Sequence, residues 1–322
     1  MGRDSGDKSL AWLLDEKGEP SIRYLALTEL LGRPKNDDQV KSAARRIPGK
    51  GWAAEIISRQ RPSGCWETER ALYLPKYLST NWMLLILSDL GLTKSDARIS
   101  KACEVWIERM GKEDGGFGLD GAKTSHLCTT GNCARALIKF GYVDHRSVTS
   151  ALEWLVRNSA EKGGWSCFGS GRNLDSWEPM SAFAVYPRAR WTRGMRDCVE
   201  KAAEYFLEKE LHVQGSHYEP WYRFHYPVHY YYDLLVGLDF ITALGYGSDR
   251  RLTHALEALR RKRNADGTWS LDAVHPDVEG GMGDWYRAHP KQAPTPFALE
   301  EVGRPSKMIT LRALTVLKRV ER

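Results

Sequence analysis

Cysteine and histidine side chains that could hold a metal ion recur where buried helices are expected to begin. Cys128 opens one such helix, Cys167 precedes the next, and His225 and His229 accompany the start of the one after. Zinc in proteins takes three or four thiolate and imidazole ligands in a tetrahedral array. The pattern therefore predicts a zinc site built from these four residues. The competing interpretation is that the cysteines are small core residues, as free cysteines commonly are.

A second group near the same helix starts could transfer protons, because it combines carboxylates, an imidazole and a phenol. This group consists of Asp175, His229, Tyr230 and Asp233. His225, His229 and Asp233 are four residues apart and would share one face of a helix. Pro227 lies between the histidines, so we expect the helix to begin near Pro227, with His225 in the preceding loop. The alternative is a polar rim with satisfied hydrogen bonds.

Aromatic and basic residues around these positions could hold a substrate. The aromatic candidates, which could line an apolar pocket, stabilise a carbocation or stack on sugars, are Trp82, Trp177, Trp221 and Tyr226. The basic candidates, which could bind a diphosphate, are Lys76, Arg223, Arg304 and Lys307. Aromatic core packing and simple solvation of the charges are the alternative interpretations.

A repeated glycine–aromatic turn organises the elements that would position these residues. Trp66, Phe117, Trp165 and Trp269 each follow a glycine closely, and the steps between them are 51, 48 and 104 residues, the last being twice 52. One turn is missing near residue 217, and residues 15–18 form the turn before Trp66. A fixed period of this size is typical of repeat architectures in which each unit buries its apolar face on its neighbours.

Each turn precedes a strongly apolar helix, which is followed by an amphipathic helix. We expect apolar helices at 79–90, 129–140, 176–185, 228–244 and 306–317, and amphipathic helices at 95–110, 144–157, 195–208 and 249–262. Helices are also expected at 9–15 and 22–31, and the count reaches six buried helices if the opening helix closes the ring. Apolar helices are buried, whereas helices with one apolar stripe lie outside them. The sequence therefore predicts an all-α fold, an α/α toroid of about six helix pairs. It would form a single domain over residues 1–322, with a long insertion at 271–303 before the last inner helix.

The composition limits the partners and the location of the protein. The net charge of +6 comes from 47 basic and 41 acidic residues without a long Lys/Arg block, so we expect no nucleic-acid partner. A mildly basic surface could still approach a membrane surface. We see neither a signal peptide nor a run of 18 apolar residues, which predicts a cytoplasmic protein with reduced cysteines. The sequence does not specify the oligomeric state.

The turns resemble those of the terpenoid cyclase and protein prenyltransferase superfamily. The segment QRPSGCW at 60–66 resembles the QW motif of squalene–hopene cyclases, and DGGF at 114–117 resembles a turn of prenyltransferase β subunits. The resemblance covers essentially the whole chain and implies a toroid of six inner and six outer helices. It says less about chemistry, because one fold hosts many functions.

Two departures from the superfamily bear on the function. The Asp-x-Asp-Asp motif with which class II terpene cyclases protonate their substrate does not occur in the sequence. Prenyltransferases bind zinc through Asp-x-Cys, and the matching residues here are His126, Leu127 and Cys128. The resemblance implies a protein that binds or converts an isoprenoid, its diphosphate or another apolar molecule in a central aromatic-lined cavity, with zinc as a candidate cofactor. A carbohydrate-active α6/α6 lyase or hydrolase and a non-catalytic toroid that binds a lipid or a protein are the alternatives.

Overall fold

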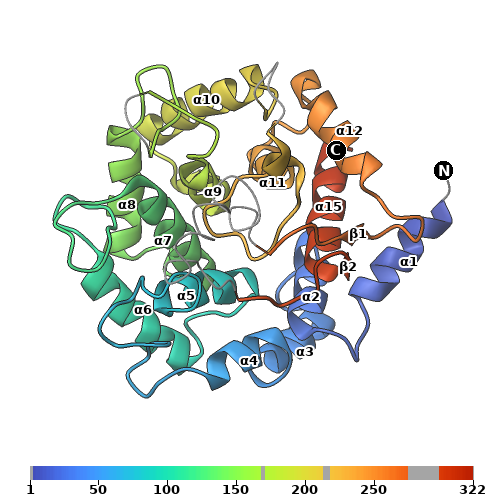
Figure 1. Ribbon diagram of the computed structural model, residues 1–322, viewed down its shortest axis with the longest axis horizontal. Helices are drawn as coiled ribbons and strands as arrows, with labels where there is room; N and C mark the ends of the chain where they lie inside the picture. Colours follow the sequence, from blue (N-terminus) through green and yellow to red (C-terminus); the bar gives the residue numbers. More distant parts are fainter. Residues whose placement is uncertain (1–2, 168–170, 213–217, 275–296, 322) are drawn as a thin grey trace, which may run out of the picture.

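The inner wall of the molecule is a ring of helices that follow one another in chain order (Figure 1). A computed structural model describes residues 3–167, 171–212, 218–274 and 297–321. The inner helices are α2 (Pro20–Leu25), continued by the π turn η1 (Ala26–Leu30), α5 (Thr80–Asp89), α7 (Leu127–Phe140), α9 (Glu178–Val185), α11 (Leu234–Ala243) and α15 (Lys307–Val320). The last inner helix, α15, contacts both α11 and α2, and so joins the end of the ring to its beginning.

A second layer of helices surrounds this wall (Figure 1). It contains α1 (Arg3–Leu13), α3 (Asp38–Arg46), α4 (Trp52–Ser58), α6 (Ala97–Met110), α8 (Arg146–Arg157), α10 (Arg193–Glu208) and α12 (Thr253–Arg261). The short elements are η2 (Ile47–Gly49), η3 (Arg188–Arg190), η4 (Glu219–Tyr222), η5 (Arg250–Leu252) and the antiparallel strands β1 (Trp269–Ser270) and β2 (Pro305–Ser306). Every residue of α5 is buried, whereas α6 buries one stripe. The predicted all-α toroid is therefore confirmed.

The repeated turns tie each outer helix to the next inner helix. Three buried indoles donate to carbonyls ten residues earlier, in the last turn of the preceding outer helix: Trp66 to Ile56 (2.7 Å), Trp165 to Leu155 (2.9 Å) and Trp269 to Leu259 (2.7 Å). Carbonyls at helix ends lack intrahelical partners, so the indole supplies one. Backbone amides in the turns donate forward to threonine hydroxyls of inner helices: Trp66 to Thr80 (3.0 Å), Phe117 to Thr130 (2.9 Å) and Trp269 to Thr310 (2.9 Å).

The fifth inner helix begins later than the sequence predicts. The expectation that it starts near Pro227 is wrong, because Asp233 is the N-cap: its carboxylate accepts a hydrogen bond from the amide of Val236 at 2.7 Å. His225 and His229 consequently lie in a non-helical segment. The predicted insertion at 271–303 falls mostly outside the described residues.

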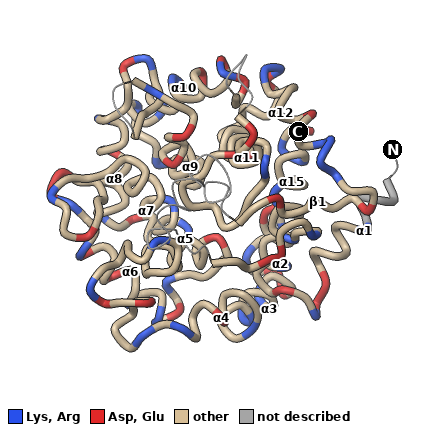
Figure 2. The backbone as a smooth tube through the Cα atoms, viewed as in Figure 1, with Lys and Arg blue, Asp and Glu red and all other residues tan. Residues whose placement is uncertain are grey.

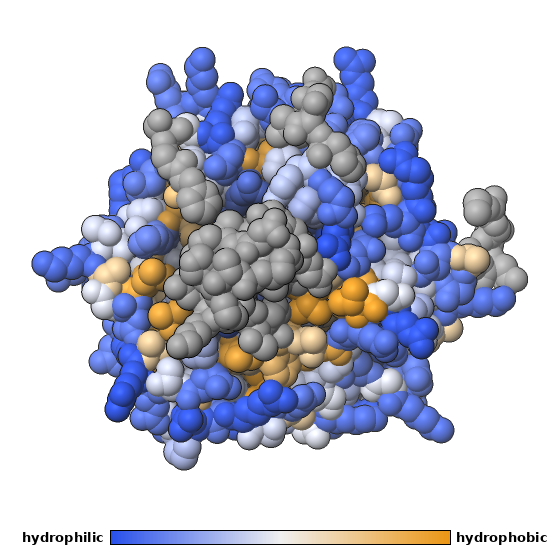
Figure 3. Space-filling view, viewed as in Figure 1, coloured by the Kyte–Doolittle hydropathy of each residue, from blue (hydrophilic) through white to orange (hydrophobic). Residues whose placement is uncertain are grey.

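The surface of the ring is charged at its perimeter. Lysine, arginine, aspartate and glutamate alternate around the outer helices (Figure 2). On the face shown in Figure 3, the perimeter is hydrophilic and apolar side chains gather nearer the centre. Within the described ranges, we find no helix with the length and apolar character needed to cross a membrane. Association with a membrane surface stays a prediction.

Candidate functional site

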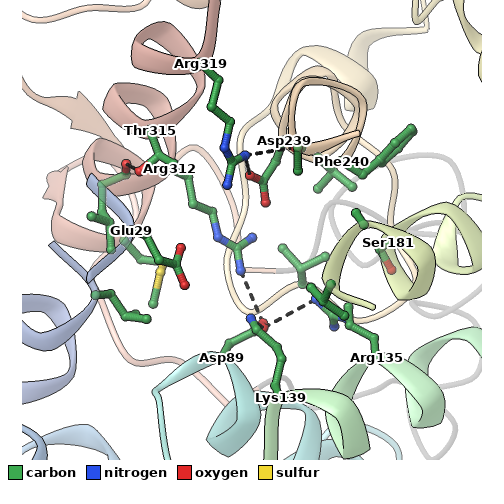
Figure 4. Close-up of a pocket in the computed structure, with 18 of the residues that line it drawn as sticks. Glu29, Asp89, Arg135, Lys139, Ser181, Asp239, Phe240, Arg312, Thr315 and Arg319 are labelled. Carbon is green, nitrogen blue, oxygen red and sulfur yellow. Dashed lines mark hydrogen bonds and ion pairs between the residues drawn. The ribbon is translucent and has the colours of Figure 1, made fainter. Parts of the chain in front are cut away.

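A cavity of about 150 Å³ lies inside the ring, between the inner helices (Figure 4). Its lining includes apolar side chains, among them Trp177, Val228, Phe240 and Leu311. It also includes a charged part, whose residues stand mostly near the carboxyl ends of the inner helices: Glu29, Asp89, Arg135, Lys139, Asp239, Arg312 and Arg319. Four basic side chains thus face three carboxyl groups, which leaves the charged part of the cavity net positive.

Asp89 is the common partner of three of the basic side chains. Its carboxylate lies 3.4 Å from Arg135, 2.7 Å from Lys139 and 3.2 Å from Arg312. Burial opposes ionisation of Asp89, but the three cations outweigh it and hold the pKa of Asp89 well below its usual range. Asp89 is therefore a permanent anion that holds the cations in place, and it is unsuited to donate a proton.

Arg135 is the most enclosed of these cations, with a residue exposure of 6%. Its guanidinium lies over the ring of Trp177, 5.8 Å from the centroid. Its Nε and Nη2 atoms find no hydrogen-bond partner within the described part of the chain. A buried donor that lacks a partner costs about 1–3 kcal/mol, so an acceptor that reached this guanidinium would be stabilising.

The pKa values of the other two carboxyl groups are shifted in opposite directions. Burial alone would raise the pKa of Asp239. The positive charges of Arg319, 2.7 Å from the carboxylate, and of Arg312 outweigh the effect of burial, so the pKa of Asp239 is lowered. Glu29 lines the cavity and its side chain is exposed. The surrounding ring desolvates the carboxyl group and raises its pKa, against the opposing charge of Lys139. Glu29 is thus the carboxyl group in this cavity best suited to donate a proton.

The charged residues of the cavity were not among the sequence candidates, although the sequence contains a signal for them. Arg135 and Lys139 are four residues apart in an apolar helix, and Arg312 and Arg319 are seven apart in another. Both spacings place two cations on one helix face. Because charged side chains are rarely buried without a partner, such pairs in buried helices indicate a shared polar interior.

Two of the four predicted zinc ligands come together in the structure. The thiol of Cys128, at the start of α7, is hydrogen-bonded to the sulfur of Cys167. This hydrogen bond lowers the pKa of Cys167 to about 7, and it raises the pKa of Cys128 together with burial. Both side chains are partly buried.

The two histidines have other neighbours. His225 Nδ1 lies 2.7 Å from a carboxylate oxygen of Asp233, and both side chains are buried. His229 stacks on Tyr77, with ring centroids 5.2 Å apart, and meets the edge of Trp82 at 5.1 Å. Burial and, secondarily, the nearby His225 lower the pKa of His229 to about 3, which leaves its ring neutral.

The described residues do not form the predicted zinc site. They contain no group of three or more histidine, cysteine, aspartate or glutamate side chains placed to hold a metal ion. A tetrahedral zinc site needs three or four protein ligands, so the pair Cys128 and Cys167 does not fit zinc by itself. Zinc stays a prediction of the sequence, and we assign no chemical step to it.

The predicted proton-transfer residues each have their own neighbours. Asp233 pairs with His225 as described above, and the exposed Asp175 accepts a hydrogen bond from the indole of Trp221 at 3.1 Å. The hydroxyl of Tyr230 is hydrogen-bonded to that of Tyr73. Burial raises the pKa of Tyr230 well above its usual value. These contacts favour packing and positioning, and a catalytic role of the four residues stays a prediction.

Of the predicted aromatic substrate contacts, Trp177 lines the cavity. Tyr226 does not line the cavity, but its ring centroid lies 5.2 Å from the guanidinium carbon of Arg312, which does. Trp82 packs in an aromatic cluster with Tyr73, and its indole donates to the Tyr73 carbonyl at 2.8 Å. Trp221 meets the edge of a neighbouring tyrosine ring, outside the cavity wall.

The predicted basic contacts do not line the cavity that the described residues form. Lys76 is partly exposed, and Arg223 donates to the carbonyl of Asp272 at 2.9 Å. Arg304 is exposed, and the ammonium of Lys307 lies 5.0 Å from the ring centroid of Trp12. The cations that face the interior come instead from α7 and α15.

Comparisons with known proteins add a local sequence similarity. No protein-family model matches the chain. Squalene–hopene cyclase of Bradyrhizobium diazoefficiens is 29% identical over 124 residues, which are 35% of this chain and 18% of that enzyme. This chain therefore matches less than a fifth of its curated relative.

Solved structures with similar chains include a protein from Actinoplanes (15% identity, 99% of both chains, TM-score 0.49). Another is the type II terpene cyclase MstE from Scytonema without ligand (16% identity, 98% of this chain and 97% of that one, TM-score 0.48). A variant of MstE in complex with geranylgeranyl dihydroxybenzoate, its substrate, is a third (16% identity, 98% and 96%, TM-score 0.47). The ring of helix pairs, taken with the local similarity to squalene–hopene cyclase, gives this chain a terpenoid-cyclase-like α/α toroid fold.

Proposed function

We propose that the central cavity binds a short isoprenoid anion. The observation that carries this proposal is the mixed lining of the cavity, which combines an apolar part that includes Trp177, Val228, Phe240 and Leu311 with a charged part that is net positive. An amphipathic ligand with an anionic head and a hydrocarbon chain matches both parts. The local similarity to squalene–hopene cyclase supports an isoprenoid as the hydrocarbon.

The head group of the ligand is best matched by a diphosphate. The side chains of Arg319 and Lys139 are each about a quarter exposed, so an anion that enters from solvent can contact them where they stand. Arg135 offers two guanidinium nitrogens that lack partners within the described part of the chain. Guanidinium groups bind phosphate oxygens through paired, charge-assisted hydrogen bonds.

The volume of the cavity limits the length of the hydrocarbon chain. An engineered apolar cavity of roughly 150 Å³ in another protein holds one benzene molecule, and the present cavity is about as large. The cavity therefore accepts about one isoprene unit. We accordingly expect the five-carbon dimethylallyl diphosphate to bind better than the ten- and twenty-carbon diphosphates.

Proton transfer to a bound ligand would fall to Glu29, since Asp89 and Asp239 are held as carboxylates. Class II chemistry begins with such a proton, and the sequence lacks the motif that usually supplies it. We therefore propose binding as the function, and Glu29 as the proton donor in any conversion of the ligand. A Glu29→Gln variant should bind the ligand and form no product in a product analysis.

Calorimetry with a series of ligands tests the proposal. The probes are dimethylallyl, geranyl and geranylgeranyl diphosphate, inorganic diphosphate, and the uncharged alcohol geraniol. We expect dimethylallyl diphosphate to bind more tightly than either the alcohol or inorganic diphosphate, because it brings both a charged head and a short hydrocarbon chain into the cavity. Loss of one charge-assisted contact in Arg319→Gln should weaken binding roughly tenfold to a hundredfold, equivalent to about 1.5–3 kcal/mol.

Arg193→Gln is the matched control, because Arg193 is on the outer helix α10 and its side chain is 95% exposed. It should bind like the wild type. Equal weakening by the two substitutions would assign the binding to general surface charge. Binding of geraniol as tight as that of geranyl diphosphate would remove the role of the basic cluster.

A further inference from the structure

A non-helical segment of the chain, residues 223–233, lies inside the ring and leads into α11 (Figure 1). Val228, in the middle of this segment, lines the cavity. Tyr226 and His229, which flank it, are buried and do not belong to the lining that the described residues form. The segment therefore contributes a single aliphatic side chain to a wall that the inner helices otherwise build.

The cavity has an open end and a closed end. Lys139 and Arg319, near the carboxyl ends of α7 and α15, have side chains that are 25% and 26% exposed. Val228 and Trp177, which precede α11 and α9, are 2% and 1% exposed. A ligand whose charged head meets Lys139 and Arg319 therefore extends its hydrocarbon chain toward Val228.

Contacts from neighbouring helices hold this segment in place. The side-chain amide of Asn132, in α7, donates to the carbonyl of His229 at 2.9 Å, and the indole of Trp177 donates to the carbonyl of Tyr230 at 3.0 Å. The ring of His229 also stacks on Tyr77, with centroids 5.2 Å apart. Because a closely packed interior yields little, the closed end of the cavity fixes how far a hydrocarbon chain can enter.

We propose that Val228 determines the length of the hydrocarbon chain that the cavity accepts, an inference that rests on the isoprenoid anion proposed above. The favoured ligand is then a diphosphate with a branched five-carbon chain. Val228→Ala removes two carbons from the closed end of the cavity, and Val228→Phe adds four. Burial of two further ligand carbons raises the affinity about tenfold, so the first variant should accept a chain that is two carbons longer.

Calorimetry of the full chain with two homologous ligands tests this inference. The probes are dimethylallyl diphosphate, its homologue 3-methylhex-2-enyl diphosphate, which has two more carbons, and inorganic diphosphate, which reports on the charged part of the cavity alone. The wild type should prefer the shorter chain, and Val228→Ala should shift the ratio of the two dissociation constants about tenfold toward the longer one. Val228→Phe should bind both no more tightly than inorganic diphosphate, whose own affinity stays unchanged in both variants.

Val199→Ala is the matched control, because Val199 is also 2% exposed but belongs to the outer helix α10. It should keep the wild-type ratio. Urea unfolding checks that each variant is folded, and Val228→Phe decides the matter if Val228→Ala is not. A wild-type ratio in the Val228 variants, or an equal shift in Val199→Ala, would overturn the role of Val228 and leave the proposed ligand standing. If the wild type binds dimethylallyl diphosphate no more tightly than inorganic diphosphate, the proposed function fails, and the role of Val228 fails with it.

Discussion

Replacement of Asp89 by asparagine removes the charge that holds the basic side chains of the cavity. Asp89 is 3% exposed, and its partners Arg135 and Arg312 have side chains that are only 7% and 14% exposed. The variant removes the carboxylate that pairs with Arg135 and leaves Arg312 with Asp239 as a nearby carboxylate. Removal of one partner from a buried ion pair costs about 3–5 kcal/mol. Lys139 is a quarter exposed and can turn to water, so we expect a loss near 3 kcal/mol.

Urea unfolding followed by circular dichroism measures this loss as a fall in the transition midpoint at an unchanged slope. Asp144→Asn is the matched control, because Asp144 pairs with Arg190 at the surface and its side chain is 71% exposed. An exposed pair contributes about 1 kcal/mol or less. Equal losses in the two variants would refute the idea that Asp89 stabilises the interior charges.

A double variant separates the charge effect from a packing effect. Arg135→Met removes the guanidinium group that loses its ion-pair partner in Asp89→Asn. In the Asp89→Asn background it should therefore destabilise less than it does in the wild type, with a coupling of about 1 kcal/mol or more. Strict additivity would mean that the two residues do not depend on each other, although their atoms lie 3.4 Å apart.

The remaining predictions concern pH, the turns, the cavity acid and zinc. The folded-state pKa of Asp89 is lowered, so its contribution to stability is present above pH 4 and falls as the solution is acidified; unfolding midpoints between pH 6 and 2 should change less in Asp89→Asn than in the wild type. Trp165→Ala should lower the free energy of unfolding by about 3–5 kcal/mol. Trp165→Phe should lower it by about 1–3 kcal/mol, because the Leu155 carbonyl loses its donor. A loss below about 1 kcal/mol in Trp165→Ala, measured by urea unfolding, would contradict the structural role of the turn. The pKa of Glu29 is raised, so the stability that its neutral form contributes is lost as the pH rises above the ordinary glutamate range, and unfolding midpoints should fall less with rising pH in Glu29→Gln than in the wild type. Elemental analysis of protein purified without chelator tests the predicted zinc site, and less than about a tenth of an equivalent of zinc would refute it. If zinc is present, Cys128→Ser and Cys167→Ser should each lose the metal.

The repeat of the turns was sufficient to predict the ring, because the same local chemistry recurs in each unit. Trp66, Trp165 and Trp269 could be recognised by spacing alone, and the structure gives all three the same hydrogen bond to an outer helix. The contact between Cys128 and Cys167 also followed from their places at adjacent inner helices.

The cavity could not be predicted in the same way, because its charges are spread over helices far apart in the sequence. Asp89 and Arg312 are 223 residues apart, yet their side chains meet at 3.2 Å. The start of α11 was placed wrongly because Pro227 is compatible with a first helical turn, whereas the side chain of Asp233 decides the true start. The local sequence pattern determines where helices and turns form, but it does not specify which polar side chains meet inside the ring.

The π turn η1 makes the wall next to Glu29 sensitive to chain length. The amide of Leu31 donates to the carbonyl of Ala26 at 2.8 Å, so this turn closes over five residues where an α-helical turn closes over four. Deletion of one residue within the turn would restore α-helical closure and rotate the preceding side chains by about 100° relative to those beyond. Glu29 would then leave the cavity while its identity stayed the same. In evolutionary terms, a single-codon insertion or deletion here would change the lining of the cavity as a substitution does, and relatives of this chain should be compared by alignment gaps as well as by residue identity.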